Sequence, residues 1–215
     1  ATVSPGAAAE LGLAPDCLVV AGTTDSVAGF LATGADAPGD AVTSLGTTLV
    51  LKLVSPRPVF AAAHGVYSHR LGERWLPGGA SNTGGGALLA HFPRERLAAL
   101  TAALRPERPT GLDYYPLPRP GERFPHGDPH LESRTSPRPQ DDVLFFQGLL
   151  EGIARIEAAG YRLLERLGAP APERVLTVGG GAANAAWTRI RARELGVPVT
   201  AAPWASAALG AARLA

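Results

Sequence analysis

The stretch VLTVGGGAAN, residues 175–184, says more about the fold than any other part of this sequence. An apolar strand runs into three glycines, and a helical segment follows from Asn184 to Leu195. Because glycine has no Cβ, the backbone N–H groups at Gly180 and Gly181 can approach a nucleotide, and the start of a helix favours an anion. The same residues also suit a tight strand–helix turn with close packing, so both interpretations stay open at this point.

Two common nucleotide-binding motifs are excluded. A dinucleotide fingerprint needs a third glycine where Asn184 stands and an acidic residue about 20 positions on, and residues 201–205 contain none. A phosphate-binding P-loop needs a lysine, and the only lysine is Lys52. That residue lies in a strand-like run with no GxxxxGK[ST] pattern around it, so a Walker-type ATPase is ruled out.

Working outward from this stretch, strands and helices alternate along the chain and predict a mixed α/β sheet covered by helices. One helix is predicted most clearly, because apolar residues recur at helical spacing between Asp141, its expected N-cap, and Gly168. The glycine-rich residues 78–86 are expected to form a turn. The proline-rich residues 93–140 are expected to form an irregular connection with an edge strand at 112–117. The remaining strands are expected at 18–21, 41–45, 48–54, 66–70, 74–76, 174–178 and 198–200, and the remaining helices at 26–31, 87–92 and 205–214.

The composition is that of an ordinary globular protein. Of 215 residues, 46% are hydrophobic and 18% are charged, and 20 Lys and Arg against 19 Asp and Glu leave a net charge of +1. Such a balance gives no electrostatic reason to expect nucleic acid or an anionic membrane as partner. The single Cys17 excludes an internal disulfide and a cysteine-rich metal site. With no apolar run of about 20 residues and no signal-peptide pattern, we expect a cytoplasmic protein.

Two further segments carry candidate chemistry. Asp25 follows the expected strand 18–21, and a carboxylate beyond the carboxyl end of a buried strand points into the crevice where α/β sheets bind ligands. Its alternative role is the N-cap of the helix that follows. The run SLGTT, residues 44–48, is expected to be a hairpin turn that offers a backbone N–H and a hydroxyl to phosphate, or an ordinary β-turn.

Taken together and in order, these segments resemble the FGGY family of carbohydrate kinases. The matching runs are VAGTTD (20–25), SLGTT (44–48), GGASNTGG (78–85), QGLLEGIA (147–154), GGGAANAAW (179–187) and AALGAA (207–212). The sequence is most similar to ribulokinase- and xylulokinase-like members. The resemblance implies the actin-like, ribonuclease-H-like ATPase fold and transfer of phosphate from ATP, with Mg²⁺ held mainly through the phosphates, to a ketopentose such as ribulose or xylulose.

The resemblance also implies roles for particular residues. Asp25 resembles the catalytic base, and Ser26 is similar to a residue near the sugar. Gly46 and Thr47 stand where the family contacts the ATP phosphates, while Gly180, Gly181 and Asn184 match the adenosine pocket. Trp187 is expected to form a wall of that pocket, and Asn82 to lie near the nucleotide. No protein ligand to a metal is expected.

The sequence departs from the family pattern at its start, where an early Asp-x-Gly-Thr phosphate turn and most of the sugar pocket are expected. We therefore interpret residues 1–36 as the closing edge of a first lobe and residues 37–215 as the nucleotide-binding lobe. The expected partners are a sugar and ATP, together with self-association or pairing with the absent lobe. The alternative is a truncated nucleotide-binding module, or pseudoenzyme, without kinase activity of its own.

Overall fold

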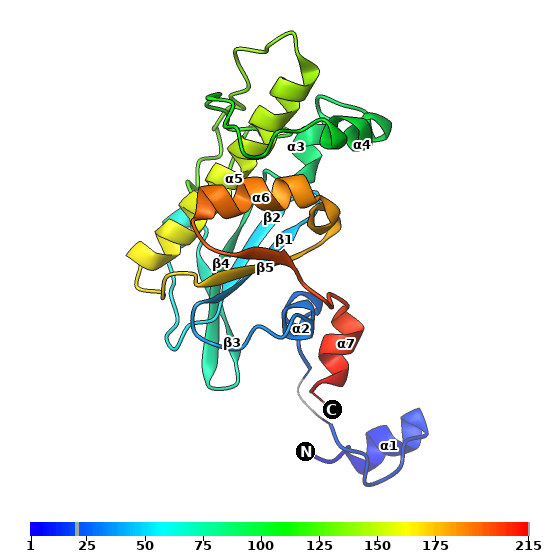
Figure 1. The fold of residues 1–215 in the computed structure, drawn as a ribbon. Coiled ribbons are helices and arrows are strands. Elements are labelled where there is room, and N and C mark those ends of the chain that lie inside the picture. The colour runs from blue at the N-terminus through cyan, green and yellow to red at the C-terminus, as the bar shows by residue number, and fades with distance from the viewer. Residues whose placement is uncertain (20–21, 215) are drawn as a thin grey trace.

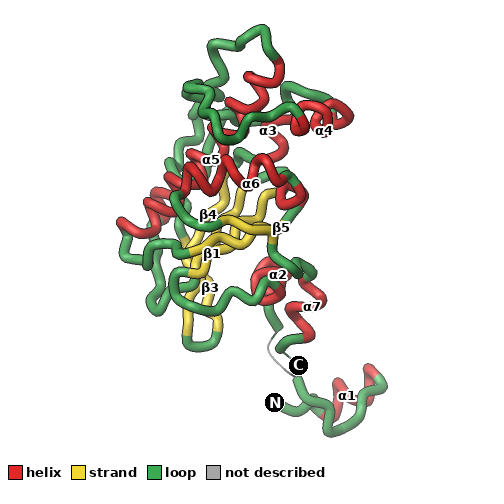
Figure 2. Tube along the Cα trace, in the orientation of Figure 1, coloured by secondary structure: helices red, strands yellow, loops and turns green. Residues whose placement is uncertain are grey.

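The computed structural model describes residues 1–19 and 22–214, and its centre is a six-stranded sheet with the order β3-β4-β2-β1-β5-β6 (Figures 1 and 2). The strands are β1 (Asp40–Leu45), β2 (Leu49–Leu53), β3 (Tyr67–Leu71), β4 (Arg74–Ser81), β5 (Arg174–Val178) and β6 (Val199–Ala201). The α-helices are α1 (Pro5–Leu11), α2 (Asp25–Ala32), α3 (Gly85–Leu89), α4 (Arg94–Ala102), α5 (Asp142–Arg166), α6 (Ala185–Leu195) and α7 (Ala207–Ala212). Short 3₁₀ turns span Ala62–His64 (η1) and Gly180–Ala183 (η2).

The sheet is mixed, as the alternation of elements predicts. β1 pairs antiparallel with β2, which pairs antiparallel with β4, and β4 with β3. On its other side β1 pairs parallel with β5, and β5 with β6. Since β1 and β5 run parallel, the turns that follow their carboxyl ends emerge at the same edge of the sheet.

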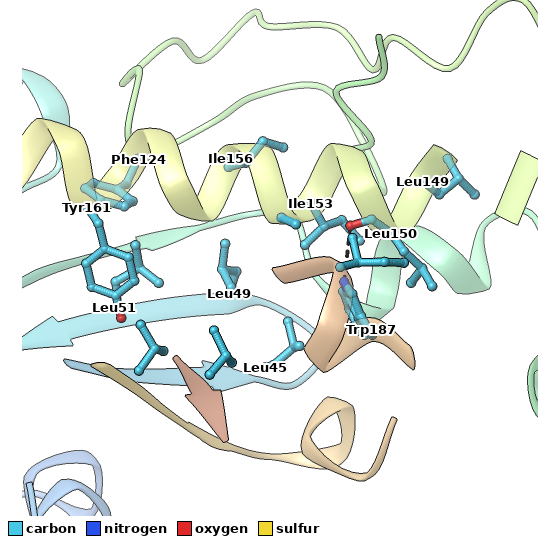
Figure 3. Close-up of a cluster of buried hydrophobic side chains, with 14 of the residues drawn as sticks. Leu45, Leu49, Leu51, Phe124, Leu149, Leu150, Ile153, Ile156, Tyr161 and Trp187 are labelled. Carbon is cyan, nitrogen blue, oxygen red and sulfur yellow. Dashed lines mark hydrogen bonds between the residues drawn. The ribbon is translucent and has the colours of Figure 1, made fainter. Parts of the chain in front are cut away.

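The main core lies between one face of this sheet and α5. Alternate residues of β2 point to one face, and Leu49, Leu51 and Leu53 are all fully buried there. Figure 3 shows Leu49 and Leu51 of the sheet facing α5, where Leu150, Ile153 and Tyr161 belong to the same buried cluster. Asp141 caps α5 by accepting from the amides of Val143 and Leu144, as the sequence predicts.

The opposite face of the sheet carries a smaller core under α2. Val27 and Phe30 of α2 pack there against Val42, Val54, Leu76 and Leu176. Helix α7 lies against α2, and the two meet closely at Gly210, where an added Cβ would stand 1.7 Å from the carbonyl oxygen of Ala28. Helices therefore cover both faces, α5 and α6 on one and α2 on the other, and α7 packs against α2 (Figure 1).

A buried ion pair ties α5 and α6 to the middle of the sheet. Nε and Nη2 of Arg191 donate to the two carboxylate oxygens of Glu157, each at 2.6 Å, and both side chains are at most 1% exposed. Arg191 also donates to Thr177 of β5, and Thr43 of β1 donates to Glu157. Burial alone would lower the pKa of Arg191, but the Glu157 carboxylate outweighs it and the pKa is raised, so the pair stays ionised.

Several expectations from the sequence are wrong in detail. Residues 78–81 extend β4 instead of forming a turn, and they pair with residues 49–52 of β2. The strand needs glycine at position 79, because an added Cβ there would stand 2.3 Å from the Phe124 ring. The region 93–140 contains a helix, α4, and at 112–117 there is only an isolated bridge between Tyr115 and Arg134.

The expected buried strand 18–21 lies partly outside the described residues. Its described part is exposed: Leu18 forms only an isolated bridge with Thr2, and Val19 is 56% exposed. Within the described ranges, no layer of the fold covers these two side chains. Helix α1, which the sequence analysis does not predict, lies apart from the sheet (Figure 1). In the described part of the chain, no helix combines the length and the apolar character needed to cross a bilayer.

We expect Arg191→Met to lower the free energy of unfolding by about 3–5 kcal/mol, because it leaves the Glu157 carboxylate buried and uncompensated. Urea denaturation measures this loss. Arg189→Met on the same helix is the control, since the pair of Arg189 with Glu107 is exposed and its removal should change stability by less than about 1 kcal/mol. Equal losses in the two variants would contradict the importance of the buried pair.

A second prediction concerns Asp40, which accepts from Nε and Nη2 of Arg174 at 2.6 and 2.8 Å and from the amides of Asp36 and Ala37. The hydrogen bond from Arg174 is the main cause that lowers the pKa of Asp40 to about 2. A carboxyl whose folded pKa is depressed stabilises the fold above its unfolded pKa of about 3.9, and this contribution is lost as pH falls towards 2. Wild type should thus exceed Asp40→Asn in stability by up to about 2 kcal/mol near neutral pH, and the gap should close between pH 4 and 2. A stability difference between wild type and Asp40→Asn that stays constant from pH 4 to pH 2 would show that the Asp40 carboxyl does not titrate as expected.

Candidate functional site

A cavity of about 610 Å³ opens at the carboxyl ends of β1 and β5. Five residues that the sequence analysis assigns to nucleotide binding line it together, although they come from two distant parts of the chain: Gly46, Thr47, Gly180, Gly181 and Asn184. The parallel pairing of β1 with β5 brings them together, because it places the hairpin after β1 beside the glycine turn after β5. This is the crevice position at which open α/β sheets bind ligands.

The hairpin turn between β1 and β2 forms one side of the cavity. The first residues of α3 hold this turn by two hydrogen bonds. The amide of Gly85 donates to the carbonyl of Gly46 at 2.8 Å, and the amide of Gly86 donates to the carbonyl of Thr47 at 3.0 Å. The amide of Gly46 donates to the carbonyl of Thr48 and is used within the hairpin. Among the described residues, no hydrogen bond uses the amide or the hydroxyl of Thr47, which is exposed. The backbone N–H and the hydroxyl that the sequence predicts for this turn are therefore both supplied by Thr47, and both can donate to an anion.

The glycine turn after β5 forms the opposite side. Gly179 needs its positive φ of 86°, and an added Cβ there would stand 2.8 Å from the carbonyl oxygen of Leu45. A Cβ on Gly181 would stand 2.5 Å from the Leu45 side chain, so this glycine serves close packing between the turn and β1. A Cβ on Gly180 would meet nothing within 4 Å. The close-packing interpretation therefore holds for Gly179 and Gly181, while Gly180 leaves the cavity side of the turn open.

Helix α4 supplies a wall that the sequence analysis missed. Leu97, Ala98 and Thr101 of α4 line the cavity, and Leu97 and Ala98 together with Phe146 and Trp187 make this part largely apolar. Trp187 is buried and its indole N–H donates to the carbonyl of Leu150, so its position in the cavity wall is fixed (Figure 3). The run RERLAALTA, rich in helix-forming residues after Pro93, is the signal that could have revealed α4.

Asn184 links this wall to the glycine turn. Its Oδ1 accepts from the amide of Trp187 at 2.9 Å and caps α6, while its Nδ2 donates to the hydroxyl of Thr101 at 3.2 Å. Arg94, at the start of α4, is the one charged residue among the described residues that line the cavity. The cavity thus has an apolar side at α4, Phe146 and Trp187 and a glycine-lined side at the two turns.

The structure does not bring Asp25 and Ser26 into this cavity. Both are exposed at the first turn of α2, on the opposite face of the sheet from α5. The N-cap is Thr24, whose hydroxyl accepts from the amide of Val27 at 3.3 Å, so the alternative role of Asp25 as the cap is not needed. Among the described residues, the one hydrogen bond that the Asp25 carboxylate accepts is local, from the amide of Ser26 at 2.7 Å.

Asn82 also lies outside the cavity lining. Its side chain donates to the carbonyl of Gly121 and accepts from Arg123, and its amide donates to Glu122, so it anchors the loop around residue 122. Among the described residues, no three His, Cys, Asp or Glu side chains gather in a way that could hold a metal ion.

The chain matches a family of known proteins and several solved structures. The model of the FGGY family of carbohydrate kinases, C-terminal domain, matches residues 41–215. Among solved structures, the xyloylose kinase of Brucella ovis is 26% identical with a TM-score of 0.79, over 99% of this chain and 46% of that one. The xylulose kinase of Rhodospirillum rubrum is 26% identical with a TM-score of 0.76, over 99% and 45%.

The gluconate kinase of Lactobacillus acidophilus has a TM-score of 0.78 at 16% identity, over 98% of this chain and 45% of that one, and shows a likeness of fold alone. The sheet and its helices thus have the actin-like ATPase fold that the sequence analysis expects. The chain spans less than half the length of these three kinases.

Proposed function

The chain belongs to the FGGY family of carbohydrate kinases, as its C-terminal domain, and on this premise we propose that it is the ATP-binding half of a sugar kinase. The observation that carries the proposal is the cavity that unites the Gly46–Thr47 turn with the Gly180–Gly181 turn. Adenine would lie against the apolar wall of α4 and Trp187. The phosphates would lie towards Thr47, whose amide and hydroxyl are available as donors.

Asp25 is proposed as the general base of this reaction. The carboxylate takes the proton from a sugar hydroxyl, the hydroxyl oxygen attacks the γ-phosphorus of ATP, and the bond to the β-phosphate oxygen breaks so that ADP leaves. Its exposure at the first turn of α2 supports this role, because a base must be open to its substrate. Ser26, next to it, is proposed to contact the same sugar.

A ketopentose such as D-ribulose or D-xylulose is the proposed acceptor, and two of the similar structures carry xylulose or xyloylose kinase as their names. The residues of the cavity fit a nucleotide but include no carboxylate for a metal, so Mg²⁺ would be held mainly by the phosphates, whose charge it neutralises. We further propose that residues 1–36 belong to the closing edge of a first lobe, that residues 37–215 form the nucleotide lobe, and that a cytoplasmic location goes with this metabolic role.

The second candidate is a nucleotide-binding module without kinase activity. The separation of Asp25 from the cavity favours it for the chain alone, since a second lobe would have to bring sugar and phosphate together. A coupled ADP-release assay with a panel of sugars decides between the two. Turnover that depends on the sugar supports the kinase, while ATP binding without turnover, in a protein with both lobes, supports the module.

For the nucleotide site we expect Gly180→Val to abolish measurable ATP and ADP binding by the chain in calorimetry. An added side chain there meets no protein atom within 4 Å, so it occupies the space of the ligand without disturbing the fold. Gly181→Val is a poorer test, because it collides with Leu45. Gly6→Val in α1 is the matched control, since its Cβ also meets nothing, and it should leave binding unchanged. Unchanged ATP affinity in a folded Gly180→Val variant would show that the nucleotide does not bind in this cavity.

For the base we expect Asp25→Asn to lower turnover by about 10²- to 10⁴-fold in a kinase that carries both lobes, with ATP affinity almost unchanged. The asparagine keeps the size of the side chain but cannot accept the proton. Thr24→Ala is the control: it removes the helix cap, costs about 1 kcal/mol of stability and should keep most of the turnover. Near wild-type turnover in the Asp25→Asn variant would show that Asp25 is not the general base.

A further inference from the structure

Arg94 is a cation at the rim of the cavity for which the described protein supplies no partner. Its side chain lines the cavity, and the residue is exposed. Within the described ranges, no ion pair involves its guanidinium group. Arg96, two residues further along, pairs with Asp142 at 3.0 Å and does not line the cavity. Of these two arginines in one helical turn, one is therefore tied to α5 and the other borders the cavity.

The spacing of residues on α4 shows where along the cavity Arg94 lies. One face of the helix lines the cavity, and it carries Arg94, Leu97, Ala98 and Thr101. The Thr101 end is fixed beside the glycine turn by the hydrogen bond from Asn184. Arg94 begins about 10 Å further along the helix axis, at 1.5 Å per residue. Because long side chains of a helix lean towards its N-terminus, the guanidinium extends from the apolar wall away from Thr101.

Helix α3 connects this part of the cavity with the hairpin turn. It begins at Gly85, whose amide donates to the turn at 2.8 Å, and its last residues, Leu88 and Leu89, also line the cavity. Helix α4 begins only a short link later, beside α3 (Figure 1). Thr47 and Arg94 therefore border the same space of about 610 Å³. Pockets for a single small ligand hold roughly 300–1,000 Å³, so one nucleotide can contact both residues.

The charge of the proposed ligand distinguishes Arg94 from the rest of the cavity. The other described residues that line the cavity are uncharged, whereas ATP and ADP are polyanions. Thr47 offers hydrogen bonds to phosphate but no charge. A guanidinium supplies both, because its planar N–H groups donate in pairs to phosphate oxygens. With the base against Leu97 and Trp187, the phosphate nearest to the base is the one that a side chain of α4 reaches first.

We propose that Arg94 donates to the α-phosphate of the nucleotide, the phosphate that is attached to the ribose. This inference rests on the proposed function and adds a nucleotide-binding residue to it. The terminal phosphates are not favoured as its partners, because they would lie towards Thr47 on the hairpin. A guanidinium can also stack on the flat face of a base, and the ligands chosen for the test distinguish that contact from one to phosphate.

The test compares wild type with Arg94→Met in the 215-residue chain, with adenosine, AMP and ADP as probes in NMR titrations, which can follow weak binding. Loss of one charge-assisted hydrogen bond should raise the Kd of AMP and of ADP by the same factor, roughly tenfold, and leave the Kd of adenosine unchanged. Arg94→Lys keeps the charge but not the planar fork, so its loss should be smaller. The melting temperature should not fall, because the exposed guanidinium has no ion pair in the described protein to lose.

Arg96→Met is the matched control, because it removes a cation from the same helical turn outside the cavity. It should leave all three Kd values within about twofold, as expected for an exposed pair. Weaker adenosine binding by Arg94→Met would place the guanidinium on the base, and a loss for ADP without one for AMP would place it on the β-phosphate. Either result, unchanged affinities, or an equal loss in Arg96→Met overturns the inference alone. A folded wild-type chain that binds none of the three ligands overturns the proposed nucleotide site and the inference with it.

Discussion

The buried pair of Glu157 and Arg191 is the interaction on which the rest of the architecture depends. It joins α5 to α6, and through Thr43 and Thr177 it fixes both helices to the two parallel strands at the centre of the sheet. Such a pair tolerates little displacement, because any shift leaves a charge without its partner in an apolar interior. The cavity lies at the end of these same strands, and its two glycine turns are therefore held at a fixed separation.

Local patterns predicted the elements whose formation depends mainly on their own residues. The apolar spacing of α5, its cap at Asp141 and the hairpin around Gly46–Thr47 needed no tertiary information. The glycines at 78 and 79 were misjudged for the opposite reason. They belong to a strand that pairs with β2, and they are glycines because the Leu51 carbonyl and the Phe124 ring occupy the space of a side chain. Both neighbours are distant in sequence. Composition cannot distinguish such a glycine from one in a turn.

The candidate site was predictable in its residues but less so in its geometry. The glycine runs identified the two turns, and the family resemblance assigned them to one nucleotide. That Asp25 lies outside the cavity, or that α4 closes it, follows only from how the strands and helices pack.

The two hydrogen bonds from Gly85 and Gly86 to the carbonyls of Gly46 and Thr47 have a consequence for binding energetics. They hold the hairpin in shape before any ligand arrives, and a Cβ on Gly85 would stand 2.9 Å from the Gly46 carbonyl oxygen. Fixing the backbone of a loose loop costs roughly 1–2 kcal/mol per residue in conformational entropy. Because this turn is already ordered, a nucleotide would bind without that entropic penalty, and more of the contact energy would appear as affinity.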